Sequence, residues 1–400
     1  MELLQTTEGW ITQLFKDKAL VEQKNKRKEL FQSLYKVQKE KFDLYVTNSR
    51  YDDVVLRNLT KRISYKYNAQ TANRYNITSQ IVGLLKETVP FGIVKIDIKK
   101  FYENINKDQI LEGVQCNPLI SLDDKSVLQK LFETDLLRTQ KGLPRGLSIS
   151  AVLSEIYLQE FDRKVRQLEG VYFYARYVDD IIVFTYENPA EVRSNIIPLL
   201  PTGLSLNEEK SKKCFYVACR CQGADKGDLQ ERQSGCRCSN ISENDFSYLG
   251  YRFVFPAVPA SKVNLSVQIA RSKIDRIKTK IVLSFLAYRK DSNFRLLVKR
   301  IKLLTGNYSL YTELSAGKTL CAGIYYNYPL LSTYCDLDEL NSFLRSWIWI
   351  SRKKSKCNLS RAQKIELMKF NFRSGYIYRR HERFSKDELK IIQGCWKDVF

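Results

Sequence analysis

Three aspartates lie in or beside predicted strands that are otherwise almost wholly apolar. Asp97 belongs to the run 93–98, where the strand period of two places it on the face opposite to its branched apolar neighbours. Asp179 and Asp180 separate two β-rich runs and occupy the tip of a short predicted hairpin. Most Asp-Asp pairs are exposed turn residues, but carboxylates at the edge of a core are costly unless something pairs with them.

Divalent cations offset that cost. Mg²⁺ takes carboxylate oxygens and keeps waters and substrate phosphates as its remaining ligands. Two such ions, about 3.5–4 Å apart, can hold both the attacking and the leaving oxygen of a phosphoryl transfer. The acids therefore indicate nucleotide addition to a nucleic acid strand with two Mg²⁺ ions.

The composition points to nucleic acid as the partner. The 400 residues carry 66 Lys and Arg against 44 acids, a net charge of +22, which a polyanion would neutralise. A basic soluble protein without such a partner is the plainer alternative. The single histidine, His381, excludes histidine triads and His-rich metal sites. With no signal peptide and no apolar run near the roughly 18 residues of a spanning helix, we expect a cytoplasmic protein without a membrane partner.

Several elements must position the acids. The first fifty residues are predicted as helix, with Leu30, Leu34 and Val37 at helical spacing. The loop 141–146 precedes a predicted helix with a long apolar stripe. Strand character returns over residues 246–253.

A basic region follows these strands. Residues 252–302 contain 13 basic residues and two acids, and a predicted helix in this region has an apolar inner stripe. We expect Lys273, Arg276 and Lys280 to point away from that stripe. They would either bind phosphates or form an ordinary face exposed to solvent. The tail from residue 310 shows no catalytic motif. Its aromatic and basic residues include Trp347, Trp349, Tyr376, Tyr378, Arg379 and Arg380.

A cluster of cysteines falls in a polar, inserted loop. Cys219 and Cys221 form one Cys-x-Cys pair, and Cys236 and Cys238 form another. Four thiolates suit tetrahedral Zn²⁺, although the usual spacing is Cys-x-x-Cys. Free thiols, a structural zinc site and a redox bridge all stay open.

Five sequence blocks, in order, resemble those of the reverse transcriptase family. Residues 97–102 resemble its first palm block, and residues 142–148 resemble the loop and helix that cradle the nucleotide. Residues 177–180, Tyr-Val-Asp-Asp, resemble the Tyr-x-Asp-Asp box. Residues 206–211 resemble the next palm block, and 246–250 resemble the primer-grip hairpin. The resemblance covers about half of the chain.

The resemblance implies a set of metal ligands. Asp97, Asp179 and Asp180 would be the metal-binding carboxylates. The backbone carbonyl of Ile98 would be a further ligand.

It also implies residues that contact the nucleotide. Tyr102 would lie against the sugar and exclude a 2′-hydroxyl, unless it is simply a buried tyrosine. Arg145 stands where many retroviral and intron enzymes carry Gln and would meet a phosphate or sugar. Lys210 would face the triphosphate, unless it is an exposed surface lysine. Arg62 and Arg74 are candidates for the fingers residues that hold the triphosphate.

The fold implied by the resemblance is α+β, a right-hand polymerase with fingers, an antiparallel palm sheet and a basic helical thumb. The expected parts are an N-terminal helical segment (1–60), fingers and palm (61–255), a thumb (256–310) and a C-terminal basic aromatic helical region (311–400).

The activity implied is RNA-directed DNA synthesis from dNTPs. The compact, single-module chain resembles the bacterial retron and defence-associated enzymes. Residues 74–77 and 303–308 favour the defence-associated group, which suggests an antiviral role. The implied partners are a structured noncoding RNA as template, the DNA product, a second reverse transcriptase subunit and an oligomeric ribonucleoprotein. The alternatives are a template-independent or protein-primed polymerase, or a catalytically idle RNA-binding scaffold.

Overall fold

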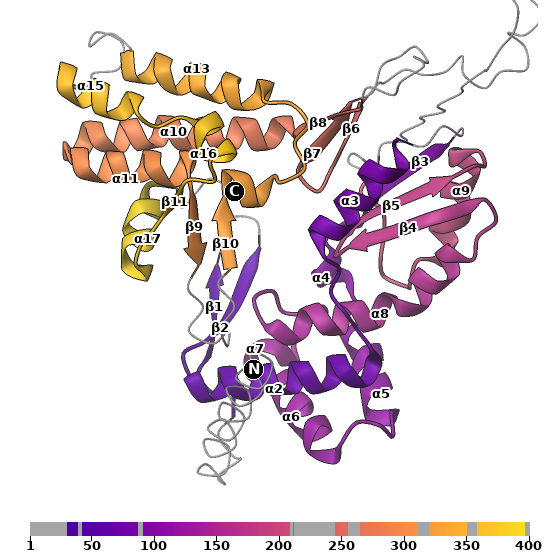
Figure 1. The fold of residues 1–400 in the computed structure, drawn as a ribbon. Helices are drawn as coiled ribbons and strands as arrows, with labels where there is room; N and C mark the ends of the chain where they lie inside the picture. The colour runs from indigo at the N-terminus through magenta and orange to yellow at the C-terminus, as the bar shows by residue number, and fades with distance from the viewer. Residues whose placement is uncertain are drawn as a thin grey trace, which may run out of the picture. The chain divides into compact units, whose positions relative to one another are not determined.

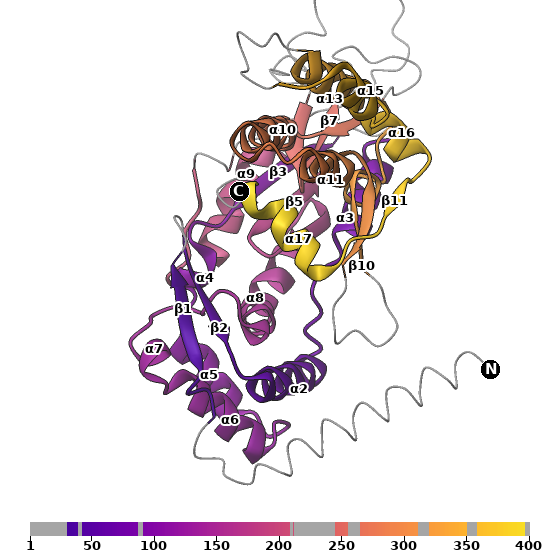
Figure 2. The same cartoon turned by 90° about the vertical axis from the view of Figure 1, so that its left-hand side faces the viewer.

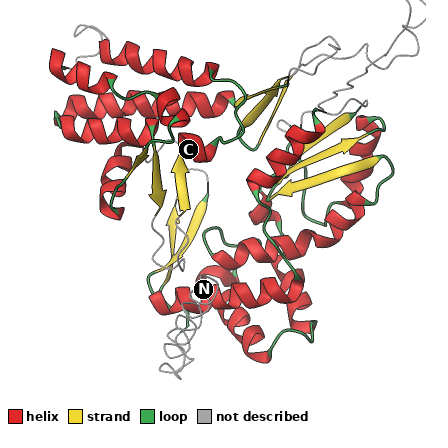
Figure 3. Cartoon of the chain, in the orientation of Figure 1, coloured by secondary structure: helices red, strands yellow, loops and turns green. Residues whose placement is uncertain are grey.

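The computed structural model describes residues 30–38, 42–86, 91–208, 211, 245–254, 265–310, 320–349 and 358–396. They belong to two compact units, one formed by residues 1–80 and 87–243 and the other by residues 81–86 and 244–400. Helices are combined with small, mostly antiparallel sheets (Figure 3), so the fold class is α+β, as the sequence predicted. Within the described ranges, no helix is both long and apolar enough to cross a membrane.

The first unit combines five strands with several helices (Figure 1). Its strands are β1 (Leu34–Gln38), β2 (Asp43–Thr47), β3 (Gly92–Asp97), β4 (Val171–Tyr177) and β5 (Asp180–Thr185). Its helices are α2 (Arg50–Tyr67), α4 (Phe101–Asn104), α5 (Lys107–Cys116), α6 (Leu122–Phe132), α7 (Asp135–Arg138), α8 (Ser148–Arg166), α9 (Pro189–Ile196) and the 3₁₀ turn η2 (Ile197–Leu199). Helix α3 (Arg74–Leu84) begins in this unit and ends in the other.

Three of these strands form the palm sheet, in the order β3-β5-β4, and both of its ladders are antiparallel. Its central strand β5 contains four consecutive apolar residues that are fully buried, Ile181, Ile182, Val183 and Phe184. Such a continuous apolar run is typical of a strand that is covered on both faces. The strands β3, β4 and β5 and the helix α8 agree with the sequence prediction.

The helix predicted through Leu30, Leu34 and Val37 is wrong. Residues 34–38 form β1 and pair antiparallel with β2, with Leu34 opposite Thr47. A tertiary contact outweighs the helical spacing, because the Tyr45 amide of β2 donates to the Arg145 carbonyl at 2.8 Å and docks the hairpin on the loop before α8. Residues 1–29 of the predicted helical segment lie outside the described residues.

The second unit is mainly helical in its described residues. Its strands are β6 (Asp245–Tyr248), β7 (Tyr251–Val254), β8 (Ser266–Ile269), β9 (Asn307–Leu310), β10 (Leu320–Gly323) and β11 (His381–Glu382). Its helices are α10 (Arg271–Asp291), α11 (Phe294–Thr305), α12 (Ile324–Asn327), α13 (Cys335–Trp349), α15 (Arg361–Met368), α16 (Phe372–Ile377), α17 (Lys386–Gln393) and the 3₁₀ turn η5 (Gly394–Trp396).

A helical hairpin organises this unit. Helix α10 ends at Asp291 and is followed by Ser292 in the left-handed conformation. The Asn293 side chain caps α11 by accepting from the Leu296 amide at 3.0 Å. The Asp336 carboxylate of α13 accepts from the Ile269 amide of β8 at 2.7 Å, which ties α13 to the β6–β7–β8 sheet. Helix α10 buries Ile274, Ile281 and Phe285 of its apolar stripe, as the sequence predicted, and its basic residues are exposed or half-buried.

Candidate active site

Two of the predicted catalytic aspartates lie opposite each other on neighbouring strands of the palm sheet. Asp97 ends β3, Asp180 begins β5, and the two are direct partners in the antiparallel register. Such partners have Cα atoms about 4.5–5.5 Å apart, with their side chains on the same face. The Ile98 amide donates to the Asp179 carbonyl at 3.2 Å, which brings the third aspartate to the same end. The backbone therefore brings together the three acids that the sequence selected.

The tip of the β4–β5 hairpin has an uncommon backbone. Val178 has φ of 59°, a left-handed conformation that a β-branched residue rarely adopts. Such a conformation costs of order 1–3 kcal/mol and persists only where the surroundings enforce it. Here the Arg176 guanidinium donates to the Val178 carbonyl at 3.2 Å. The side chain of Arg176 thus supports the turn that carries Asp179.

Arg176 is the centre of a buried polar cluster between β4 and α8. Its side chain is only 4% exposed, and it donates to Asp162 at 2.7 and 2.9 Å and to Glu155 at 2.6 and 3.2 Å. The Tyr174 hydroxyl also donates to Asp162, at 2.5 Å. The sequence analysis missed this cluster. The available signal was an arginine within an apolar strand, next to a helix with two acids two turns apart.

Mutual pairing fixes the charges of the cluster. Burial would lower the pKa of Arg176, but Asp162 and Glu155 raise it overall, so the guanidinium stays charged. Burial raises the pKa of Glu155 despite the favourable charge of Arg176. Burial likewise raises the pKa of Tyr174 well above its usual value, and the Asp162 charge adds to the effect. A buried ionic cluster of this kind tolerates the loss of a partner poorly.

Hydrogen bonds hold Asp97 from its other side. The Asn207 amide donates to the Asp97 carbonyl at 2.8 Å, and the Asp97 amide donates to the Ser211 hydroxyl at 3.1 Å. Ile98 forms an isolated antiparallel bridge with Leu206. Leu206, Asn207 and Ser211 of the segment that the sequence identified as a further palm block therefore lie beside the first aspartate.

The loop before α8 packs directly on Tyr102. The Leu143 amide donates to the Tyr102 carbonyl at 2.8 Å. A Cβ on Gly142 would lie 2.4 Å from that same oxygen, so this close approach requires glycine. Tyr102 itself is half-buried, and burial is the main cause of its raised pKa.

Arg145 joins this loop to its neighbours. Its guanidinium donates to both carboxylate oxygens of Glu103, at 2.6 and 3.0 Å. It also lies 5.1 Å from the ring centroid of Phe42 and 5.2 Å from that of Tyr102. The ion pair raises the pKa of Arg145. Burial would raise the pKa of Glu103, but the hydrogen bond from Arg145 lowers it overall. Glu103 and Phe42 are site residues that sequence reasoning did not find.

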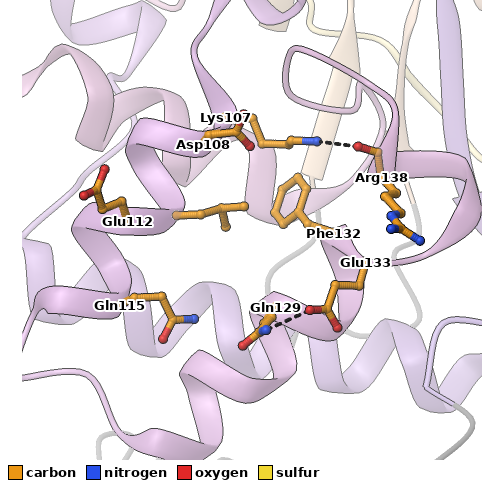
Figure 4. A pocket seen from close by; sticks show the side chains of 9 residues that line it. Lys107, Asp108, Glu112, Gln115, Gln129, Phe132, Glu133 and Arg138 are labelled. Carbon is orange, nitrogen blue, oxygen red and sulfur yellow. Dashed lines mark hydrogen bonds between the residues drawn. The ribbon is translucent and has the colours of Figure 1, made fainter.

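A cavity of about 350 Å³ lies among α5, α6 and α7 (Figure 4). The Lys107 ammonium lies at its edge and donates to the carbonyls of Leu137, Arg138 and Gln140, at 3.0, 3.3 and 2.6 Å. Lys107 therefore secures the chain just before the loop that carries Arg145. The residues that line this cavity do not include any of the sequence-predicted site residues.

The donor set at the end of the palm sheet fits Mg²⁺. Asp97 is a buried carboxylate opposite a second one, and Mg²⁺ prefers such hard oxygen ligands. In polymerases, Mg²⁺ is bound by one or two carboxylates together with substrate phosphates. A cross-strand pair of aspartates can supply the carboxylates. In the described part of the chain, no three His, Cys, Asp or Glu side chains are gathered into a cluster able to hold a metal ion by themselves.

The predicted triphosphate contacts have varied surroundings. The Arg62 guanidinium makes a forked ion pair with Asp124 of α6, with N–O distances of 2.6 to 3.1 Å, so it already has a partner within its own unit. Arg74 is the first residue of α3 and is half-buried. Lys210 lies outside the described residues.

The cysteines considered for zinc, Cys219, Cys221, Cys236 and Cys238, also lie outside the described residues. Within the described ranges the cysteines are free thiols, namely Cys116, Cys321, Cys335 and Cys395.

The three predicted thumb cations share helix α10 of the second unit. Lys273, Arg276 and Lys280 are all half-buried. The pKa of Lys280 is lowered, first by burial and then by the charges of Arg276 and Lys273. The three positive charges therefore repel one another, and a bound anion would relieve that repulsion.

Three aspartates at one end of an antiparallel sheet, in a unit where a glycine loop packs on Tyr102, define the class of palm-type nucleic acid polymerases. The family model for reverse transcriptase (RNA-dependent DNA polymerase) matches residues 50–253, just over half of the chain. The chain belongs to the reverse transcriptase family. No curated protein sequence gives a significant match.

Solved structures of telomerase are distantly similar. Apo telomerase from Candida tropicalis, truncated from the C-terminal domain, has 14% identity and a TM-score of 0.40, over 60% of this chain and 54% of that one. Telomerase from Candida albicans with a TWJ fragment of telomeric RNA has 11% identity and a TM-score of 0.33, over 85% and 53%. The chain thus spans little more than half the length of these proteins, and its family assignment depends on the sequence match.

The buried cluster gives a test of how the catalytic turn is held. Arg176→Lys keeps one charge but loses the fork that reaches the two carboxylates and the Val178 carbonyl together. We expect kcat for nucleotide addition to fall at least about 10-fold with little change in KM, because the aspartates remain but are misplaced. Primer extension at varied dNTP concentration measures both constants.

The matched control is Arg163→Lys on α8, whose ion pair with Glu160 is more than half exposed on both sides. It should leave both constants unchanged, and thermal unfolding of each variant separates loss of fold from loss of positioning. A folded Arg176→Lys protein with a normal kcat would contradict the role assigned to the cluster.

Proposed function

We propose that this protein is an RNA-directed DNA polymerase that works by two-metal phosphoryl transfer. The observation that carries the proposal is the cross-strand pair of Asp97 and Asp180, with Asp179 on the adjoining turn, in a chain of the reverse transcriptase family. The net charge of +22 supports a nucleic acid substrate, because it attracts polyanions whatever their sequence.

The catalytic work assigned to the chain is positioning and charge neutralisation. Asp97, Asp179 and Asp180 are the proposed carboxylate ligands of the metals, and the backbone carbonyl of Ile98 is a further ligand. Mg²⁺, when bound, neutralises charge on the attacking and leaving oxygens. The protein holds the primer end and the nucleotide in line and does little covalent chemistry itself.

Nucleotide selection is assigned to Tyr102, whose ring would leave no room for a 2′-hydroxyl. This is supported by the packing of the Gly142 loop on Tyr102 and by the Arg145 guanidinium beside the ring. Lys210, Arg62 and Arg74 are proposed to meet the triphosphate, which for Arg62 requires release from Asp124.

The biological setting is also a proposal. The resemblance of residues 74–77 and 303–308 to defence-associated enzymes favours an antiphage role in a bacterial cytoplasm. The template would then be a structured noncoding RNA, and a second reverse transcriptase subunit or an oligomeric ribonucleoprotein would be a partner. Sequencing the nucleic acid that copurifies with the protein tests this setting.

The metal ligands are tested by Asp179→Asn, which removes an anionic ligand with little change of shape. We expect incorporation of dNTPs on a primed RNA template to be lost, while thermal stability and RNA affinity stay near those of the wild type. Asp108→Asn, at an exposed position on α5, is the control and should retain full activity. Near-normal incorporation by the Asp179 variant would contradict the mechanism.

The sugar contact is tested by Tyr102→Val. A smaller side chain removes the steric clash, so incorporation of GTP should rise relative to dGTP, with some loss of overall rate from poorer positioning. Single-nucleotide extension of a defined primer gives kcat/KM for each nucleotide. Tyr157→Val, at another half-buried tyrosine of the same unit, is the control. If the Tyr102 variant stays as selective as the wild type, the selecting group is a different residue.

The basic side of α10 is proposed to bind RNA phosphates. Reversal of Lys273, Arg276 and Lys280 to Glu should weaken RNA binding and reduce the slope of log affinity against log salt by about 2 to 3. A charge-matched reversal of the exposed cations Arg361, Lys369 and Lys390 is the control. If the two triple variants reduce RNA affinity and its salt slope equally, the loss is caused by net charge and not by a contact between α10 and RNA.

A further inference from the structure

Tyrosines and arginines gather on the surface of the second unit, beyond the region that matches the family. The tyrosine–arginine patch consists of Tyr325 and Tyr326 of α12, Tyr334, Arg373 and Tyr376 of α16, and Arg379. Both views show α16 beside the sheet that contains β10 and β11 (Figures 1 and 2). The polymerase mechanism uses none of these residues.

The four rings of the patch form a continuous row. The ring centroid of Tyr325 lies 5.3 Å from those of both Tyr326 and Tyr376, and that of Tyr334 lies 5.8 Å from that of Tyr376. The inner ring of Tyr376 is buried, whereas Tyr326 and Tyr334 at the two ends are 41% and 36% exposed. The row therefore offers two solvent-facing aromatic side chains that are braced from within.

Each half of the row carries an arginine. The Arg379 guanidinium lies 4.3 Å from the Tyr325 ring centroid, and that of Arg373 lies 5.1 Å from the Tyr334 centroid. Both arginines are exposed. The Asp338 carboxylate faces Arg373 at 3.0 Å, and it is itself about half exposed. The patch thus combines aromatic rings with accessible positive charge.

The backbone at Arg379 is unusual for its position. Arg379 has φ of 48° just after α16, where a helix that ends in the left-handed conformation usually has glycine. A residue with a Cβ is strained in that conformation. The Arg379 amide donates to the Tyr376 carbonyl at 3.2 Å, which fixes the backbone from which the guanidinium reaches the tyrosine row.

The rings are held by a rigid support. A Cβ on Gly375 would lie 1.8 Å from the Thr305 carbonyl, so α16 packs against the end of α11 through a position that only glycine can occupy. The Asn307 side chain donates to the Gly375 carbonyl at 3.1 Å and accepts from the Tyr325 amide at 2.9 Å. These bonds connect α12 and α16 through one residue, so that the patch is organised before any partner arrives.

We propose that the tyrosine–arginine patch binds single-stranded RNA. Bases would stack on the exposed rings of Tyr326 and Tyr334, and Arg373 and Arg379 would contact the backbone phosphates. Stacking on an aromatic ring does not depend on base identity, so the patch would hold an unpaired segment of any sequence. The choice of RNA as the strand rests on the proposed RNA-directed function. The net charge of +22 provides the complementary field.

The first test is the double variant Tyr326→Ala/Tyr334→Ala. We expect affinity for an unstructured RNA of about 20 nucleotides to fall at least about 10-fold, because two stacking surfaces are lost. Affinity for the same sequence as a blunt duplex should change much less. Tyr186→Ala, at a tyrosine exposed to 63% after β5, is the matched control and should bind as the wild type does. Filter binding without dNTPs measures all of these affinities, so the outcome does not depend on the catalytic assignments.

Arg379→Gly separates a binding role from a structural one. Glycine is the residue that suits φ of 48°, so the melting temperature should change little, although the guanidinium is lost. We expect weaker binding of the single-stranded RNA and a salt slope reduced by about 1.

Unchanged affinity for single-stranded RNA in both variants overturns the proposal. In that case any change in self-association of the variants, measured by sedimentation, would assign the patch to contacts between proteins. Loss of affinity for single-stranded DNA alone, with RNA binding intact, also overturns it.

Discussion

The register of β3 against β5 is the constraint on which the rest of the structure depends. It sets Asp97 directly opposite Asp180 at the end of the sheet, and like charges in that position destabilise an antiparallel pair. The two strands are paired at six positions, from Gly92–Thr185 to Asp97–Asp180, and a slip of one residue would reverse the facing of every side chain. The fold thus maintains a concentration of negative charge that a divalent cation would relieve.

Supports from several elements converge on the same end of the sheet. Arg176 connects the strained Val178 turn to two carboxylates of α8, and Ser211 closes on Asp97 from the other side. Lys107 secures the chain that leads into the loop of Arg145. Catalysis by positioning requires that ligands stay within fractions of an ångström, and these buried contacts supply that rigidity.

The sequence predicted the parts of this site that depend on local pattern. The strands and the hairpin followed from apolar runs and from the position of the acids, so Asp97, Asp179 and Asp180 could be selected together. An arginine within an apolar strand signalled a buried partner for Arg176, but the sequence did not show which one. The carboxylates that pair with Arg176 and Arg145 lie 14 to 42 residues away in the chain. The β1–β2 hairpin was missed for the same reason, because its docking on the Arg145 carbonyl is a tertiary contact that local spacing does not encode.

The central claim is that the protein, with its catalytic aspartates at the end of the palm sheet, copies an RNA template into DNA. The direct measurement is to supply a DNA primer annealed to an RNA of defined mixed sequence, with Mg²⁺ and all four dNTPs, and to sequence the extended strand. The account predicts a product complementary to the RNA that stops at the template end and is absent when the template is omitted. Extension that proceeds equally without the RNA, or whose sequence ignores it, would contradict the account.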